Sequence, residues 1–466
     1  MSESTARKRG RFGPAPLALF LALVLGCTAP EVVTDSRPLG SLEDVLAMRD
    51  RSDVNVLFVL VDTLRADRLG AYGYSRDTSP TIDYLAETGV RFGNQVAQSS
   101  WTKCSMSSLW TGLYPARTGV LRSQDAISPD ARMPAEIMLD AGFRTAAIWR
   151  NAWIAPNFGF SQGFEIYHSP RAISVSADQR AASPGKISGS DADLIRSASE
   201  FLRAHADDRW FLYLHLMDVH QYVYDDDSAL FGTGYSDSYD NSIHWVDSLL
   251  GRLFEELEKR DLRKRTLIVF AADHGEAFGE HGGEGHARNV YGEVTTTPFI
   301  LSFPFRLEPN IVVQSRSANV DLWPTVLDLV GLSELDDPDG QSLLPAIEAS
   351  ARGEKLAEDD RPTFAQLDRT WARLRLEPQP VIAVNSEKWR LVYQPDRPDH
   401  SELFDKEADS AEQRNISLEQ PEVVAALVRE IDAHLENPSP PWGTAAHIEI
   451  DEMQMQQLRA IGYGVQ

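Results

Sequence analysis

The feature that most constrains the fold is the segment DVNVLFVLV at 53–61, which is apolar at nearly every position. Successive side chains of a strand point to opposite faces, so such a strand is buried on both faces, as in a parallel sheet covered by helices. Similar runs follow at 210–216 and 266–272, and each comes after a segment with helical spacing, 191–204 and 239–259 respectively. Helices that alternate with doubly buried strands predict an α/β fold.

The character of the chain changes after residue 355. Residues 380–394 alternate like an antiparallel hairpin, and 420–435 has the spacing of a helix. We therefore expect a main α/β domain over 53–355 and a smaller C-terminal subdomain with an antiparallel sheet over 356–436. Residues 437–466 are expected to form a linker and a terminal helix.

The N-terminus has the features of an export signal. Basic residues precede the apolar run LALFLALVL at 17–25, and Gly26-Cys27 follows. This arrangement resembles a bacterial lipoprotein signal, with a signal peptide over 1–26, lipidation of Cys27 and a tether over 27–52. A signal anchor or a buried segment is the alternative. The interpretation implies a protein of the bacterial cell envelope, lipid-anchored to the outer membrane and facing the periplasm or the exterior.

Charge and cysteine content narrow the partners. The chain has 45 basic and 69 acidic residues, a net charge of −24, which repels polyanions and makes nucleic acid an unfavourable partner. There are two cysteines. If Cys27 is lipidated, Cys104 has no intramolecular partner and no disulfide is expected.

Polar residues cluster just after the three predicted strands. Asp62 follows the first, His220 comes four residues after the second, and Asp273-His274 follows the third. Open α/β sheets bind ligands at the carboxyl ends of their strands. Two carboxylates and an imidazole there suit a divalent cation, although a strand-terminal Asp is often only a helix cap.

Seven segments carry a resemblance to a known family. They are, in order, residues 54–74, 107–120, 211–222, 266–282, 285–294, 320–331 and 402–417. Together they resemble the sulfatase family of the alkaline phosphatase superfamily. The resemblance implies an alkaline-phosphatase-like sandwich with a mixed, mostly parallel central sheet and a smaller antiparallel subdomain. It also implies metal-assisted attack on a sulfate or phosphate ester.

The nucleophile is chosen by its distance from a turn. The family motif runs CxPSRxxLxTG, and LWTG at 109–112 matches its end. Counting back seven residues from Leu109 reaches Thr102, whereas Cys104 would shorten the motif by two. We expect Thr102 to be the nucleophile, with Cys104 as the alternative.

A threonine changes the chemistry that the family resemblance implies. It cannot be oxidised to formylglycine as a cysteine or serine can, so no formylglycine is expected. A threonine hydroxyl next to a divalent cation is still a competent nucleophile for phosphoryl transfer. Lipoteichoic acid synthases, phosphoethanolamine transferases and nucleotide pyrophosphatases of the same superfamily use threonine here.

The resemblance also implies a set of metal ligands. Asp62, Asp273 and His274 would bind one divalent cation, with Thr102 completing its ligands. Thr63 stands where many sulfatases have a second aspartate and is expected to support the site from behind. One fewer carboxylate favours zinc or manganese, with calcium possible. A second metal would need a histidine at the position of Tyr222, so one metal is expected.

The residues expected to hold the substrate are only partly those of the family. His220 matches a family histidine, and Arg150 stands at a family lysine position as a catalytic candidate. His286, His281 and Lys103 are expected to bind substrate, and Arg117 to support the nucleophile turn. The two loop histidines, His220 and His286, could instead be ordinary hydrogen-bonded residues, and an exposed lysine is the commoner state.

These observations leave three hypotheses. The first is a metal-dependent hydrolase of sulfate or phosphate esters that uses Thr102 and acts on a sulfated or phosphorylated small molecule or glycan. The second is a transferase that moves a phospho-substituent to an envelope glycan or lipid. The third is a catalytically degenerate glycan-binding protein, suggested by Thr63, Met106 and Ala152.

Overall fold

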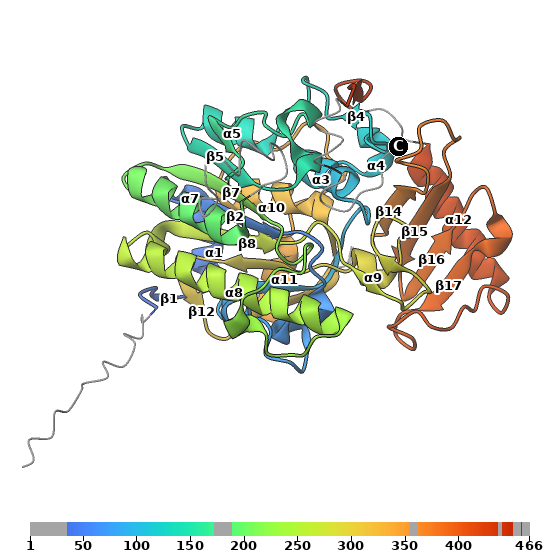
Figure 1. The fold of residues 1–466 in the computed structure, drawn as a ribbon, viewed down its shortest axis with the longest axis horizontal. Coiled ribbons are helices and arrows are strands. Elements are labelled where there is room, and N and C mark those ends of the chain that lie inside the picture. Colours follow the sequence, from blue (N-terminus) through green and yellow to red (C-terminus); the bar gives the residue numbers. More distant parts are fainter. Residues whose placement is uncertain (1–34, 172–188, 355–360, 437–439, 451–457, 459–466) are drawn as a thin grey trace, which may run out of the picture. The chain divides into compact units, whose positions relative to one another are not determined.

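The three apolar runs are neighbouring strands at the centre of one large sheet (Figure 1). β2 (Asn55–Val61) lies between β8 (Thr266–Ala271) and β7 (Trp210–Leu216) and runs parallel to both. The structure is a computed structural model that describes residues 35–171, 189–354, 361–436, 440–450 and 458. Both expected neighbours of β2 are strands whose every residue is buried, as the apolar runs predict.

The sheet has eight strands in the order β13-β3-β11-β8-β2-β7-β5-β6. Only β11 pairs antiparallel with its neighbours, β3 and β8; the other pairs are parallel. The remaining strands are β3 (Val90–Val96), β5 (Arg144–Trp149), β6 (Ile166–His168), β11 (Phe299–Ser302) and β13 (Ile311–Ala318). The predicted fold class, a mixed and mostly parallel central sheet, is confirmed.

Helices cover both faces of this sheet, because successive side chains of β2 point to opposite faces and are apolar on both. Val56, Phe58 and Leu60 pack in one core cluster with α3, α5, α10 and α11. Leu57 and Val59 pack in another with α2, α7 and α8. These helices are α2 (Pro80–Glu87), α3 (Thr102–Thr111), α5 (Pro134–Asp140), α7 (Asp191–Ala204), α8 (Tyr235–Lys259), α10 (Leu322–Leu329) and α11 (Leu344–Arg352).

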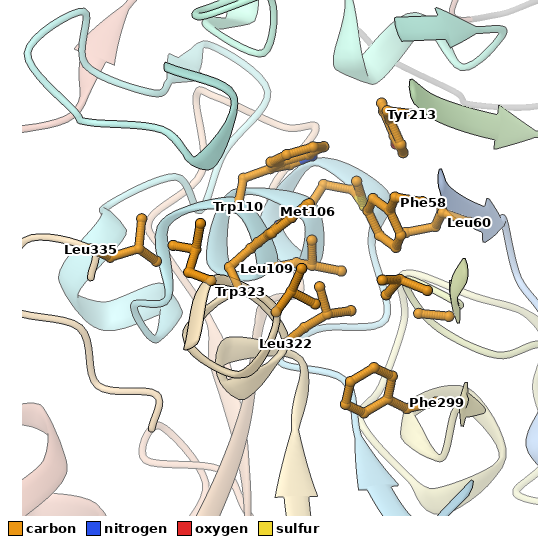
Figure 2. Packing of buried hydrophobic residues seen from close by; sticks show 14 of the residues in the cluster. Phe58, Leu60, Met106, Leu109, Trp110, Tyr213, Phe299, Leu322, Trp323 and Leu335 are labelled. Carbon is orange, nitrogen blue, oxygen red and sulfur yellow. The ribbon is translucent and has the colours of Figure 1, made fainter. Parts of the chain in front are cut away.

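Aromatic packing fixes α3 against the sheet (Figure 2). The ring of Trp110 meets Phe58 of β2 edge-on at 5.8 Å and stacks on Trp323 of α10 at 4.9 Å. Met106 and Leu109 of the same helix are fully buried in this cluster. Each such side chain contributes about 1.5–3 kcal/mol of burial free energy. The N-terminus of α3 is therefore held in a fixed place at the end of β2.

The two predicted long helices are both present. α7 spans the predicted 191–204, and α8 begins at Tyr235, four residues before the predicted start. The extra turn of α8 carries polar residues, so hydrophobic spacing does not mark it.

The C-terminal subdomain is a four-stranded antiparallel sheet with one long helix. Its strands, β14 (Thr363–Asp368), β15 (Pro380–Ser386), β16 (Trp389–Tyr393) and β17 (Glu402–Asp405), pair in chain order. On one face, Ile382 and Leu391 pack against α12 (Pro421–Leu435). The other face, including Ala383 and Val392, joins the core of the main domain. The subdomain therefore shares a continuous core with the main domain.

Residues 36–50 differ from the tether predicted over 27–52. β1 (Leu39–Gly40) pairs with β12 (Arg306–Leu307), and the segment continues as the short helix α1 (Leu42–Leu46). Val45 and Met48 are fully buried in the main core, next to α10 and α11. The packing of these two apolar side chains makes this part of the segment an element of the folded domain.

The remaining elements are short. They are α4 (Pro115–Thr118), α9 (Gly292–Thr295), β4 (Asp125–Ala126), β9 (Ala277–Phe278), β10 (Glu284–Gly285) and β18 (Ala446–His447). Of the predicted terminal helix, only Leu458 is described, and it is buried. None of the helices in the described part of the chain has the length and apolar character needed to cross a bilayer.

Candidate active site

Three elements bring the four expected metal-site residues together. Asp62 follows β2, Asp273 and His274 follow β8, and Thr102 is the first residue of α3. Thr102 Oγ1 lies 3.2 Å from His274 Nε2 and 3.5 Å from Asp62 Oδ2. The ligand atoms of Asp62, Asp273 and His274 all lie within 4.8 Å of one another. All four side chains are fully buried.

The hydrogen bonds of these residues leave a specific set of atoms facing one another. Asp273 Oδ1 accepts from the backbone N–H groups of Thr63 and His274, and Asp62 Oδ2 accepts from neighbouring side chains. Asp62 Oδ1 and Asp273 Oδ2 are buried with no hydrogen-bond partner among the described residues. Buried carboxylate oxygens without a donor are costly unless a cation binds them.

His274 has the tautomer that a metal ligand needs. Its Nδ1 lies 3.0 Å from the carbonyl oxygen of Gly275, which can only accept, so Nδ1 carries the proton. Nε2 then keeps its lone pair and lies 3.3 Å from Asp273 Oδ2. Two carboxylate oxygens and one imidazole nitrogen suit a divalent cation such as zinc or manganese.

The electrostatics of the two aspartates differ. Burial would raise the pKa of Asp62, but the hydrogen bond from His215 and the nearby histidines hold it below its usual range. Burial and the Asp62 carboxylate raise the pKa of Asp273 to about 7. Like charges forced together in a dry site repel each other, and a bound cation would relieve that repulsion.

Cys104 is in a different environment from Thr102. Its side chain is 1% exposed and packs in the apolar core, and burial raises the pKa of its thiol to about 12. On a helix, side chains two positions apart point in directions that differ by about 200° around the axis. Thr102 and Cys104 therefore face nearly opposite ways. The thiol is therefore directed away from the cluster of Asp62, Asp273 and His274, in agreement with the Thr102 register.

Thr63 supports the site through its backbone. It has a left-handed φ of 61°, unusual for a β-branched residue, and this conformation points its N–H at Asp273 Oδ1, 3.2 Å away. Its hydroxyl donates to the carbonyl oxygen of Asp62 at 2.6 Å. Strain of this kind persists only where the surroundings fix it and is common at functional sites.

Two residues that contact Asp62 were missed by sequence reasoning. Asn151, between Arg150 and Ala152, donates from Nδ2 to Asp62 Oδ2 at 2.6 Å and to Thr102 Oγ1 at 3.3 Å. His215 of β7 lies 3.0 Å from Asp62 Oδ2 through Nε2, with its Nδ1 next to Tyr213 Oη. A signal for His215 was a polar residue inside an otherwise apolar strand.

Three histidine rings, those of His220, His286 and His274, pack against one another at tilted angles and form a histidine cluster in which His274 contacts Thr102. The ring of His286 lies 4.7 Å from that of His274 and 4.9 Å from that of His220. His286 Nδ1 is 3.1 Å from Oε2 of Glu276, a buried carboxylate that the sequence did not single out. Burial lowers the pKa of His220 to about 4. Both predicted histidines, His220 and His286, are thus next to the metal-site residues.

Arg150 is paired with carboxylates beneath the turn that carries His220. Its guanidinium donates to Asp191 Oδ1 at 2.6 Å, to Asp218, and to Gln221 Oε1 at 2.8 Å. These ion pairs raise its pKa although burial opposes them. Arg150 therefore braces residues 218–221, and its charge is compensated by two aspartates.

Lys103 does not face the cluster. Its Nζ donates to the carbonyl oxygens of Ser123 and Asp125, both at 2.6 Å, and lies over the rings of Trp153 and Phe158. The side chain is fully buried, and burial lowers its pKa well below the ordinary value. This geometry does not provide the substrate contact predicted for Lys103. As the next residue of the helix, Lys103 points about 100° away from Thr102 around the helix axis.

Two further predicted residues lie in polar clusters away from Thr102. His281 stacks on Tyr291 at 3.9 Å, with Nδ1 next to Glu293 Oε1 and Nε2 next to the carbonyl oxygen of Glu412, each at 2.8 Å. Arg117 donates to Asp339 Oδ1 at 2.8 Å, and Asp339 in turn accepts from the backbone N–H of Tyr114. Arg117 thus braces the turn after α3. Cys27, the predicted lipidation site, lies outside the described residues.

Comparison with known families identifies this arrangement. The model of the Sulfatase family matches residues 54–332, more than half of the chain, and includes all four residues of the cluster. The chain belongs to the sulfatase family. A second model, N-sulphoglucosamine sulphohydrolase, C-terminal, matches residues 279–438. The family resemblance drawn from the seven segments is confirmed, and the protein is an ester hydrolase by family.

Curated relatives match over most of their length. An N-acetylgalactosamine-6-O-sulfatase of Bacteroides thetaiotaomicron is 23% identical, over 80% of this chain and 91% of its own. An ulvan-active sulfatase of Formosa agariphila is 24% identical, over 82% of this chain and 80% of its own. The similarity therefore extends through both the main domain and the C-terminal subdomain.

Solved structures share the fold at low identity. Ps i-CgsB in complex with k-i-k-neocarrahexaose superposes with a TM-score of 0.67 at 19% identity, covering 88% of this chain and 98% of that one. The phosphonate monoester hydrolase SpPMH of Silicibacter pomeroyi gives a TM-score of 0.64 at 20% identity, covering 85% and 99%. The fold is thus shared with a protein solved in complex with k-i-k-neocarrahexaose and with a phosphonate monoester hydrolase.

Proposed function

We propose that this protein is a metal-dependent hydrolase of sulfate or phosphate esters in which Thr102 is the nucleophile. The observation that carries the proposal is the convergence of Thr102 Oγ1, His274 Nε2 and the unpartnered oxygens of Asp62 and Asp273 in one buried cluster. These atoms fit one divalent cation, and the sulfatase family generally uses a metal ion. Zinc or manganese fits the mixed donor set better than calcium.

Each residue of the cluster has a distinct task. A divalent cation held by Asp62, Asp273 and His274 would supply Lewis-acid stabilisation and lower the pKa of the Thr102 hydroxyl. Asn151 fixes the position of that hydroxyl, since its amide donates to both Thr102 and Asp62. His220 and His286 are suited to contact the nonbridging oxygens of the ester, where negative charge is concentrated.

The reaction balances in two steps. Thr102 Oγ1 bonds to the phosphorus or sulfur, the bond to the leaving alcohol breaks, and the hydroxyl proton ends on that alcohol. Water then attacks the threonine ester, and a proton returns to Thr102 as phosphate or sulfate leaves. Burial of the cluster limits the approach of other nucleophiles.

A threonine nucleophile favours the phosphate side of this proposal. The formylglycine hydrate, which releases sulfate without a second attack, cannot form from Thr102. The likeness to a phosphonate monoester hydrolase is compatible with phosphoryl chemistry on this fold. A transferase is the second candidate, and threonine at the nucleophile position is the observation that favours it.

Similar proteins suggest which class of molecule carries the ester group. Two similar proteins are an N-acetylgalactosamine-6-O-sulfatase and an ulvan-active sulfatase, and one structural neighbour is in complex with a neocarrahexaose. We therefore propose a glycan as the substrate. We also propose that the enzyme is anchored in the bacterial envelope through a lipid on Cys27. If the parent partitions into the detergent phase and Cys27→Ser does not, this supports the lipid anchor.

The test is hydrolysis of three nitrophenyl esters by residues 28–466 with added manganese or zinc. The sulfate, the phosphate monoester and the phosphate diester are compared in the parent, Thr102→Ala and Cys104→Ala. Turnover that disappears only in Thr102→Ala supports the proposal. Turnover that survives in Thr102→Ala and disappears in Cys104→Ala contradicts it. An added alcohol that competes with water for the phosphoryl group would identify the transferase.

A further inference from the structure

Glu276 is a buried carboxylate that the proposed reaction does not yet use. It follows the Asp273-His274 pair, is 2% exposed, and its Oε2 lies 3.1 Å from His286 Nδ1. Its Oε1 is buried with no hydrogen-bond partner among the described residues. A buried carboxylate that is only half satisfied costs stability, so its presence calls for a functional explanation.

The surroundings of Glu276 argue against a purely structural ion pair. Within the described part of the chain, its side chain forms one ion pair, with His286, and no lysine or arginine contacts its carboxylate. The buried Glu412, in contrast, has Lys406 at 2.7 Å and Arg390 at 3.3 Å. Glu276 is thus placed against an imidazole, as are the carboxylates that orient histidines in many active sites.

The partner of Glu276, His286, is part of the histidine cluster. The ring of His286 lies between those of His274 and His220, and His274 contacts Thr102 Oγ1 at 3.2 Å. A hydrogen bond from Nδ1 to a carboxylate fixes both the angle of an imidazole ring and its tautomer. Glu276 therefore orients a ring that packs against His274, the residue whose Nε2 contacts the Thr102 hydroxyl.

We propose that Glu276 is a positioning residue that holds His286 with its proton on Nδ1 and its ring facing the ester at Thr102. This inference rests on the proposed function and adds the residue that fixes the orientation and tautomer of the His286 ring. The carbonyl oxygen of Glu276 is itself fixed, since Arg65 donates to it at 2.9 Å. The backbone on which the carboxylate stands is therefore anchored independently of His286.

The kinetic test compares Glu276→Leu, His286→Ala and the double variant on nitrophenyl phosphate. Glu276→Leu is expected to lower kcat on the order of 10- to 100-fold with little change in KM, as for other residues that orient active-site histidines. In the His286→Ala background the same change should cost less than about threefold, because coupled residues are not additive. A full loss in both backgrounds would overturn the proposal.

The control is Asp247→Asn, which changes a carboxylate of equal burial on α8. Asp247 accepts from the N–H groups of Thr81 and Ile82 and caps α2, away from the Thr102 cluster. It is expected to lower the unfolding midpoint and leave kcat unchanged. A kcat loss in Asp247→Asn equal to that in Glu276→Leu would make the kinetic effect a consequence of destabilisation and would overturn the assignment.

The second readout is the ring tautomer, which does not depend on turnover. Nitrogen-15 NMR of labelled histidines, with His286 assigned by its absence in His286→Ala, is recorded at a pH where the ring is neutral. The proton is expected on Nδ1 in the parent and mainly on Nε2 in Glu276→Leu. An unchanged tautomer would overturn the proposal even if no ester is hydrolysed, and failure of the parent to turn over would count against the proposed function alone.

Discussion

The hydroxyl of Thr102 is held in place by an amide and an imidazole. Asn151 Nδ2 is 3.3 Å from Thr102 Oγ1 and 2.6 Å from Asp62 Oδ2, and its own Oδ1 accepts from the N–H of Trp153 at 2.8 Å. A nucleophile that is misplaced by about 1 Å loses much of its rate. Asn151 is therefore the neighbour on which the position of Thr102 most directly depends.

We predict that Asn151→Ala lowers kcat on the order of 10- to 100-fold, because the amide that orients both Thr102 and Asp62 is removed. The measurement is steady-state hydrolysis of nitrophenyl phosphate. The matched control is Asn55→Ala, an equally buried asparagine at the start of β2 that accepts from the N–H of Trp210. It should lower stability and leave kcat unchanged. Equal kcat in Asn151→Ala and the parent would contradict the role.

Lys103 gives the opposite expectation, a loss of stability without loss of binding. Lys103→Met removes the ammonium that satisfies the carbonyl oxygens of Ser123 and Asp125. Each unsatisfied buried carbonyl costs about 1–3 kcal/mol, so for the two carbonyls we expect the free energy of unfolding measured in urea to fall by about 2–6 kcal/mol. KM should stay unchanged. A large rise in KM at unchanged stability would restore the substrate contact first expected for this lysine.

The residues that spacing selects lie together in the structure, and their roles as nucleophile and metal ligands stay predictions, whereas the direction in which Lys103 points was not predictable. Counting from Leu109 selects Thr102, and the strand ends select Asp62 and the Asp273-His274 pair. Which way Lys103 faces depends on how α3 is rotated against the sheet, and that is set by Trp110 and its distant partners. Spacing within the sequence could not supply this rotation.

At the scale of elements, the ends of β2 and β8 place two carboxylates in one dry site. Burial and the neighbouring Asp62 raise the pKa of Asp273 to about 7, which marks the cost of holding both groups without a cation. A cation that binds only the folded state stabilises it by mass action. We therefore expect a bound cation to stabilise the fold at these two strand ends.

We predict that manganese or zinc raises the melting temperature of chelator-treated protein by about 5 °C at a concentration of 100 Kd. Differential scanning fluorimetry measures the shift. Asp273→Asn, which keeps the shape of the side chain and removes its charge, should lose most of it, whereas Asp247→Asn should keep it. An equal shift in all three proteins would place the binding elsewhere.

Element boundaries were predictable in proportion to their apolar periodicity. β7 and α7 match their predicted ranges, whereas the polar first turn of α8 was missed. Residues 36–50 were assigned to a tether because the segment is short and mixed in composition. Val45 and Met48 are buried only because α10 and α11, some 280–300 residues later, cover them. Local sequence does not contain that contact.

At the scale of the whole molecule, a polar cluster joins the catalytic domain to the C-terminal subdomain. His281 and Glu293 come from the main domain, and the carbonyl oxygen of Glu412 comes from the subdomain. Glu412 Oε2 also accepts from the N–H of Gly292 at 2.9 Å. Because both ring nitrogens of His281 face acceptors, the charged imidazolium is the form that satisfies them.

We predict that this junction weakens at alkaline pH. Burial would lower the pKa of His281, but the bonds to Glu293 and Glu412 outweigh it and raise the pKa to about 9. A raised folded-state pKa gives stability that is fully present below about pH 6.5 and is lost as pH rises through about 9. We expect the free energy of unfolding of the parent, measured in urea, to fall by about 1 kcal/mol between pH 7 and pH 10. His281→Gln should abolish this fall. Identical pH profiles in both proteins would contradict this.

The covalent step at Thr102 is the central feature of the proposed reaction. The most direct measurement is to mix the enzyme with excess nitrophenyl phosphate or nitrophenyl sulfate, stop the reaction with acid within the first turnovers, and map the adduct by peptide mass spectrometry. We expect a phosphoryl or sulfuryl group on Thr102 and an unmodified Cys104. An adduct on Cys104, a formylglycine at that position, or release of nitrophenol with Thr102 unmodified would contradict it.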